Sequence, residues 1–85
     1  MSLKIAIVDD NTFLIHSIKE KLSFFDDITL KHTSLNGSEL LTKLEDNHNI
    51  DVILMDIEMP VLNGIETTQI VKQKYPQIKI ILWKP

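Results

Sequence analysis

The chain has 85 residues, a net charge of −3 at pH 7 and no cysteine, with 44% hydrophobic and 25% charged residues. This composition suits one small globular domain over residues 1–85, and the lack of cysteine excludes disulfide bonds, thiol nucleophiles and cysteine-based zinc sites. The acidic balance argues against nucleic-acid binding by this segment, and the short apolar runs argue against a membrane span or a secretion signal. We therefore expect a cytoplasmic protein.

The first predicted elements are a buried strand and an amphipathic helix. Residues 4–8 form a short apolar run that ends at Asp9-Asp10, which is typical of a strand covered on both faces. A helix is predicted over about residues 12–25, with Asn11 as its N-cap. Its apolar stripe comprises Ile15, Ile18, Leu22 and Phe25, and we expect Phe13 and Phe24 to serve the core as well.

The rest of the chain repeats this alternation of strand and helix. A weakly alternating segment at residues 28–33 predicts a second strand, and a second helix is predicted over about residues 38–46. Asn36 and Glu39 have the spacing of a capping box before that helix. The remaining predicted elements are a strand at residues 51–56, a helix over about residues 64–74 that Tyr75-Pro76 stops, and a strand at residues 79–82.

Strands that alternate with helices predict an α/β fold with an open, doubly wound parallel sheet. In such sheets, ligands bind at the carboxyl ends of the strands. Two of the predicted strands end in carboxylates there, Asp9 and Asp10 on the first and Asp56 on the third.

If the first and third strands are neighbours, these three carboxylates meet at one point. Clustered negative charges raise one another's pKa, and a hard divalent cation such as Mg²⁺ relieves the conflict. A carboxylate beside bound Mg²⁺ is also a competent nucleophile towards phosphorus. The residue types therefore suggest aspartyl-phosphate chemistry, although they do not say which carboxylate is modified.

Several motifs resemble those of bacterial response-regulator receiver domains, in the CheY-like superfamily. They are Ile7-Val8-Asp9-Asp10-Asn11, Asn36-Gly37, Asp51-Val52, and Leu54-Met55-Asp56-Ile57-Glu58-Met59-Pro60 followed by Asn63-Gly64. The resemblance implies a flavodoxin-like receiver fold with strand order 2-1-3-4. It also implies a two-component signalling role without free-standing enzymatic activity, and the overall pattern is nearest to receivers that carry a DNA-binding output domain downstream.

The resemblance also assigns roles to individual residues. Asp56 would accept a phosphoryl group from a sensor histidine kinase or a phosphotransfer protein. Asp9, Asp10, Asp56 and the backbone carbonyl of Glu58 would hold Mg²⁺, and the Glu58 side chain could tune the access of water.

The sequence departs from the family pattern near its end. Trp83 occupies the position where the family places Thr or Ser, and the fifth strand and last two helices have no counterpart. Lys84-Pro85 resembles the family's terminal Lys-Pro pair, which makes Lys84 a hypothetical surrogate clamp for phosphate. The chain therefore resembles a receiver truncated after its fourth strand, and we expect self-association through the exposed sheet edge.

Other readings of these residues stay open. A non-phosphorylatable pseudo-receiver could keep the acidic pocket as a protein-interaction domain, and a metal-dependent phosphatase of related fold is a third possibility. Asp9 and Asp10 could simply cap the first helix, and Asp56 could cap its loop. His16, His32 and His48 lack the spacing of metal ligands, so no zinc site is expected.

Overall fold

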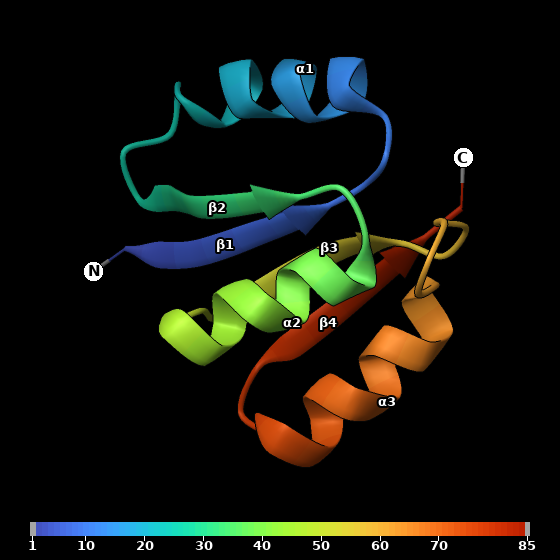
Figure 1. Ribbon diagram of the computed structural model, residues 1–85. Coiled ribbons are helices and arrows are strands. Elements are labelled where there is room, and N and C mark those ends of the chain that lie inside the picture. The colour runs from blue at the N-terminus through green and yellow to red at the C-terminus, as the bar shows by residue number, and fades with distance from the viewer. Residues whose placement is uncertain (1, 85) are drawn as a thin grey trace.

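Four parallel strands form one sheet with the order β2-β1-β3-β4 in the computed structural model, which describes residues 2–84. The elements are β1 (Leu3–Val8), α1 (Thr12–Leu22), β2 (Ile28–Ser34), α2 (Gly37–Asp46), β3 (Val52–Asp56), α3 (Gly64–Lys74) and β4 (Lys79–Trp83). Helix α1 covers one face of the sheet, and α2 and α3 cover the other (Figure 1). The predicted doubly wound α/β fold and its strand order are confirmed.

No helix within residues 2–84 has both the length and the apolar character that a membrane span requires.

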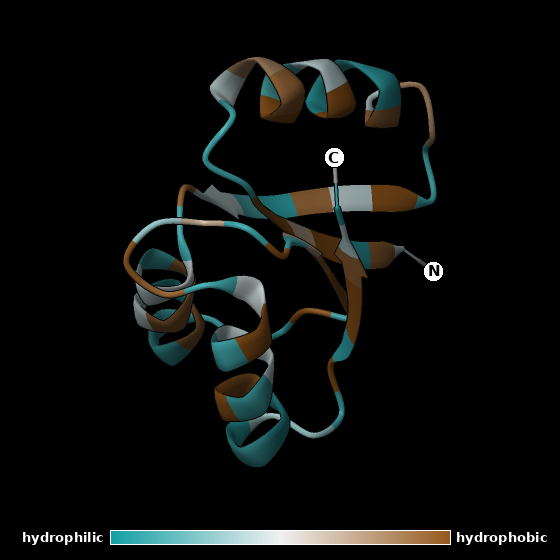
Figure 2. Cartoon of the chain, turned by 90° about the vertical axis from the view of Figure 1, so that its right-hand side faces the viewer, coloured by the Kyte–Doolittle hydropathy of each residue, from teal (hydrophilic) through white to brown (hydrophobic). Residues whose placement is uncertain are grey.

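Each face of the sheet has its own hydrophobic core. On β1, Ile5 and Ile7 contact Ile15 of α1, whereas Ala6 and Val8 join the buried residues of α2 and α3. Figure 2 shows hydrophobic segments along the strands, which lie between the helix layers. Because successive side chains of a strand point to opposite faces, a strand with cores on both sides must be apolar throughout.

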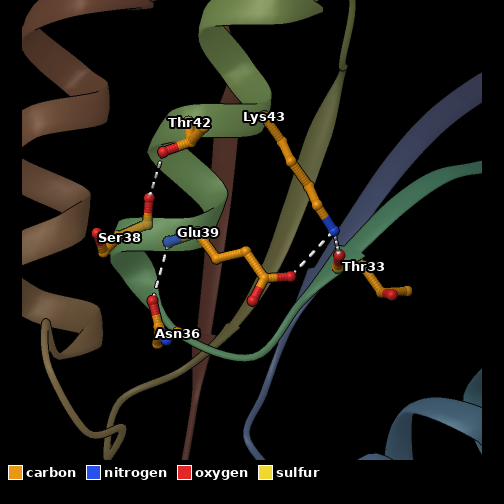
Figure 3. A network of polar contacts seen from close by, with 6 residues as sticks. All are labelled: Thr33, Asn36, Ser38, Glu39, Thr42 and Lys43. Atoms are coloured by element: carbon orange, nitrogen blue, oxygen red, sulfur yellow. Dashed lines mark hydrogen bonds and ion pairs between the residues drawn. The ribbon is translucent and has the colours of Figure 1, made fainter.

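An asparagine caps each of the three helices. The Asn11 side chain accepts a hydrogen bond from the amide of Leu14, and Asn36 accepts one from the amide of Glu39. The Glu39 side chain does not complete the expected capping box with Asn36 but pairs with Lys43 at 3.1 Å, and the Lys43 ammonium also donates to the carbonyl of Thr33 (Figure 3). This network ties α2 to the end of β2.

The prediction that three phenylalanines serve the core was wrong. The side chains of Phe13, Phe24 and Phe25 are 88%, 85% and 55% exposed. Phe13 lies two residues before Ile15, which at 3.6 residues per turn places it on the opposite side of α1. Helix α1 ends at Leu22 and not at Phe25, so Phe24 and Phe25 lie in the turn before β2.

Strand β2 contains an irregularity beside a histidine whose ring nitrogens are buried. The register between β1 and β2 shifts after Ile5, so that Lys31 has no partner and His32 pairs with Ala6. Both ring nitrogens of His32 are buried and have no hydrogen-bond partner among the described residues. Burial, followed by the positive charges of Lys43 and Lys31, lowers the pKa of His32 from its ordinary value of 6.5.

We predict that acidification destabilises the fold through His32. The unfolded chain protonates this histidine below about pH 6.5 while the folded chain keeps it neutral. The contribution of His32 to the free energy of unfolding is therefore fully present above that pH and is lost as the pH drops below it. Urea unfolding at about pH 7.5 and pH 5.5 should give a lower midpoint at the acidic pH, and His32→Leu should reduce the difference. The exposed His16 supplies the control, since His16→Gln should keep the pH dependence. An unchanged difference in His32→Leu would refute this explanation.

Candidate functional site

The carboxylates at the ends of β1 and β3 lie side by side. Val8 of β1 pairs with Met55 of β3, so the following residues, Asp9 and Asp56, are neighbours across the two strands. One carboxylate oxygen from each of Asp9, Asp10 and Asp56 lies within 4.8 Å of the other two. The structure thus brings together the three carboxylates that the sequence pointed to.

Backbone amides orient two of these carboxylates. One oxygen of Asp9 accepts the amide of Asn11 at 2.8 Å, and one oxygen of Asp56 accepts the amide of Glu58 at 3.1 Å. Asp9 is 2% exposed and Asp56 is 3% exposed, whereas Asp10 is exposed. Both buried carboxylates are therefore held in fixed positions inside the fold.

The second oxygen of Asp9, Oδ2, is buried and has no hydrogen-bond partner among the described residues. Burial raises the pKa of Asp9 above its ordinary value, the amide of Asn11 opposes this, and the negative charges of Asp56 and Asp10 raise it further. The Oδ2 atom of an ionised Asp9 consequently lacks a favourable partner among the described residues. Three carboxylates with one orphaned oxygen form a donor set that fits a hard divalent cation such as Mg²⁺.

These side chains surround a cavity of about 190 Å³. Its lining comprises Asp9, Asp10, Asn11, Leu14, Asp56, Glu58 and Trp83. Trp83, the last residue of β4, pairs with Asp56 in the sheet and lines the cavity at the position where the family resemblance implies a hydroxyl. That Asn11 and Leu14 line this cavity could not be predicted from the sequence, because helix periodicity does not show which residues of the first turn face the strand ends.

The loop after Asp56 is fixed by the start of α3. The amide of Gly64 donates to the carbonyl of Ile57 at 2.9 Å. A Cβ atom at Gly64 would lie 2.4 Å from the carbonyl oxygen of Asp56, so only glycine permits this approach. A complete capping box between Asn63 and Glu66 begins the helix. Its Asn-x-x-Glu signature was present in the sequence but was not recognised there.

The three histidines lie away from this site. His16 lies 3.7 Å from Glu20 on the exposed side of α1, and the ring of His48 stacks on Tyr75 with the ring centres 5.1 Å apart. His32 lies on β2, as described above. The role of the Glu58 carbonyl as a ligand and the role of Asp56 as an acceptor stay predictions.

Comparisons with known proteins agree on one family. The model of the response regulator receiver domain matches residues 5–83. A protein-glutamate methylesterase/protein-glutamine glutaminase of Clostridium acetobutylicum is 42% identical over 81 residues, which cover 95% of this chain and 23% of that protein. The transcriptional regulatory protein DegU of Brevibacillus brevis is 34% identical over 80 residues, which cover 94% of this chain and 34% of that protein.

A solved structure gives the same result. The response regulator domain of Thermotoga maritima CheB superposes with a TM-score of 0.89 and 30% sequence identity, covering 99% of this chain and 61% of that one. The chain thus spans a quarter to a third of the two relatives and about three fifths of that domain. By its matching family model, its fold and its acidic strand ends, this chain belongs to the response regulator receiver domains of two-component systems.

Proposed function

We propose that this receiver domain accepts a phosphoryl group on Asp56, with Mg²⁺ held by Asp9, Asp10, Asp56 and the backbone carbonyl of Glu58. The observation that carries the proposal is the cavity in which the carboxylate of Asp56 lies within 4.8 Å of two other carboxylates. The donor would be the phosphohistidine of a sensor histidine kinase or of a phosphotransfer protein. The activities named for the longer relatives are not assigned to this chain, which matches only part of each.

Three features favour Asp56 over its neighbours as the acceptor. The free oxygen of Asp9 is buried without a hydrogen-bond partner among the described residues, which suits it to a small cation. Asp10 is exposed and lacks the water-excluding surroundings that strengthen electrostatic stabilisation of the transition state. In Asp56 the amide of Glu58 fixes one carboxylate oxygen, which orients the other.

The transfer is a simple displacement at phosphorus. A carboxylate oxygen of Asp56 forms a bond to phosphorus as the bond between phosphorus and the donor's imidazole nitrogen breaks. The electron pair of that bond goes to the nitrogen, which takes up a proton, and Asp56 becomes an acyl phosphate. Bound Mg²⁺ would supply positive charge to the phosphoryl oxygens, while Asp9 and Asp10 hold it in place.

The rival function, a pseudo-receiver that binds a partner without phosphorylation, has one specific observation in its favour. Trp83 lines the cavity where the family supplies a hydroxyl for the phosphate. Its indole can donate one N–H but cannot accept a hydrogen bond, and it takes up considerably more space. The two functions differ in whether a phosphoryl group can enter the cavity.

We predict that acetyl phosphate with Mg²⁺ modifies the chain once, at Asp56. Mass spectrometry should show the addition of one phosphoryl group, and Asp56→Asn should abolish it because the amide is not a competent nucleophile. Asp46→Asn, which removes an exposed carboxylate at the end of α2, is the matched control and should leave the modification intact. If the unaltered chain stays unmodified and beryllofluoride fails to bind, the pseudo-receiver function is the correct one.

The uncovered part of the sheet suggests a second proposal, self-association. On the face that α1 covers, an apolar cavity of about 220 Å³ is lined by Ile7, Leu14, Ile18, Leu54, Ile81 and Trp83. Strand β4 is the last in the sheet order, and Ile81 is 48% exposed. We propose that a second copy pairs antiparallel along this edge, because a two-fold axis at Ile81 would place Lys79 of each copy opposite Trp83 of the other and allow a cation–π contact.

Substituting the edge tests this proposal. Light scattering over a concentration series should show dimers of the unaltered chain, and Ile81→Lys should give monomers because it buries a charge at the centre of the contact. Ile65→Lys is the control, since Ile65 is 47% exposed but lies on α3 away from the edge. A chain that remains monomeric at every concentration would rule the dimer out.

A further inference from the structure

Two asparagine–glycine bonds lie at the starts of helices. Both glycines of the chain follow an asparagine, and both asparagines follow a leucine, so that Leu-Asn-Gly occurs at residues 35–37 and again at residues 62–64. Asn36 and Asn63 are the N-caps of α2 and α3, and the side-chain oxygen of each accepts the amide three residues further on. The two sites are therefore alike in local sequence and in capping, and they differ in the contacts around them.

This dipeptide can lose the side-chain amide of its asparagine. Asparagine is a chemically labile residue, and glycine has no side chain to shield its nitrogen. That nitrogen gives up its proton to a base and forms a bond to the side-chain carbonyl carbon, whose bond to the amide nitrogen breaks with release of ammonia. Water then opens the cyclic imide at either of its two carbonyls, which leaves aspartate or isoaspartate.

The folded chain restrains both glycine nitrogens. Gly37 and Gly64 are buried. The amide of Gly37 donates to the carbonyl of Leu62 at 3.3 Å, and the amide of Gly64 donates to a carbonyl of the loop after β3 at 2.9 Å. Since a base must reach the nitrogen, either reaction in the folded chain requires local opening, and its rate depends on what that opening breaks.

Asn63 is held by contacts that have no counterpart at Asn36 among residues 2–84. The backbone amide of Asn63 donates to the side chain of Glu66 at 3.4 Å, which completes the capping box. Its carbonyl also accepts the hydroxyl of Thr67 at 2.7 Å. In α2 the residue that corresponds to Glu66 is Glu39, whose carboxylate forms an ion pair within the helix instead (Figure 3). Opening around Asn63 must therefore break more hydrogen bonds than opening around Asn36.

The acceptor for the Gly37 amide lies next to a strained turn. Val61 has a φ of 71°, which is unfavourable for a β-branched residue. The amide of Leu62 donates to the carbonyl of Pro60 at 2.8 Å, which closes the turn around Val61. Relaxation of this turn would move the Leu62 carbonyl away from Gly37. The hydrogen bond that restrains this glycine nitrogen thus depends on a strained segment.

We propose that Asn36 is a modification site of the folded chain, which loses its side-chain amide when the loop between β2 and α2 opens, while the capping box protects Asn63. The site is independent of the proposed phosphoryl transfer. Conversion to aspartate keeps a helix cap and adds a negative charge at the N-terminus of α2, which is favourable there. Conversion to isoaspartate adds a methylene group to the backbone and displaces the cap. The alternative is that both asparagines react only through global unfolding, and then at equal rates.

Peptide mapping by mass spectrometry measures both rates in one sample. In the folded chain at mildly alkaline pH, Asn36 should react about tenfold faster than Asn63, which corresponds to a difference of about 1.4 kcal/mol in the free energy of local opening. In concentrated urea the two rates should agree within about twofold, because only the shared Leu-Asn-Gly sequence then matters. Equal rates in the folded chain would overturn the proposal, and so would an Asn36 that stays intact there while both sites react in urea.

Substitutions at the third position of each helix test the source of the protection. Glu66→Ala removes the capping box and should reduce the ratio of the two rates by about threefold or more, whereas Glu66→Gln can still complete the box and should keep the ratio. Glu39→Ala is the matched control in α2 and should also keep it. Urea midpoints check that each variant is folded. If Glu66→Ala leaves Asn63 as slow as in the unaltered chain, the capping box does not protect it and the proposal fails.

Discussion

The hydrogen-bonded pairing of β1 with β3 forces carboxylates of like charge to share one small space, and the functional site depends on this constraint. The two strands run parallel in register, so the residues that follow Val8 and Met55 must emerge together. Burial and the neighbouring negative charges raise the pKa of Asp9, which shows that the arrangement disfavours its ionised form. A fold relaxed for stability alone would avoid such a cluster.

The apolar residues of the same strands hold the cluster together. Ala6, Val8, Ile53 and Met55 are fully buried beneath α2 and α3, while Ile5 and Ile7 are covered by α1. Burying one side chain of the Val, Ile or Met type contributes about 1.5–3 kcal/mol relative to leaving it exposed. Several such residues on each strand outweigh the repulsion at the strand ends. The strain is thereby concentrated where a cation or a phosphoryl group would relieve it.

The fold and the placement of the acidic residues could be predicted from the sequence because both depend on strong local patterns. Apolar runs that end in aspartate fix the strands, and the order of strands and helices leaves few topologies. The exposed phenylalanines were mispredicted because hydrophobicity alone does not show which side of α1 faces the sheet or at which residue the helix ends. The setting of His32 could not be foreseen, since a register shift in β2 is determined by packing between strands.

The positions of the residues at the end of β4 could not be predicted from the family resemblance. Resemblance identified Trp83 as a departure, but only the structure reveals that Trp83 lines the cavity and that Lys84 contacts Glu58 beside it. The site is therefore a receiver's acidic pocket closed by side chains of a different kind.

The most direct test of this account is calorimetric measurement of Mg²⁺ binding to the unaltered chain, to Asp9→Asn and to Asp56→Asn. It gives the number of ions bound and shows whether a carboxylate from each strand end contributes to the affinity. If carboxylates from β1 and β3 share one cation, the chain binds one ion, and each substitution alone weakens that binding strongly. Binding that persists unchanged in Asp56→Asn would show that the two strand ends do not form a common site and would contradict the account.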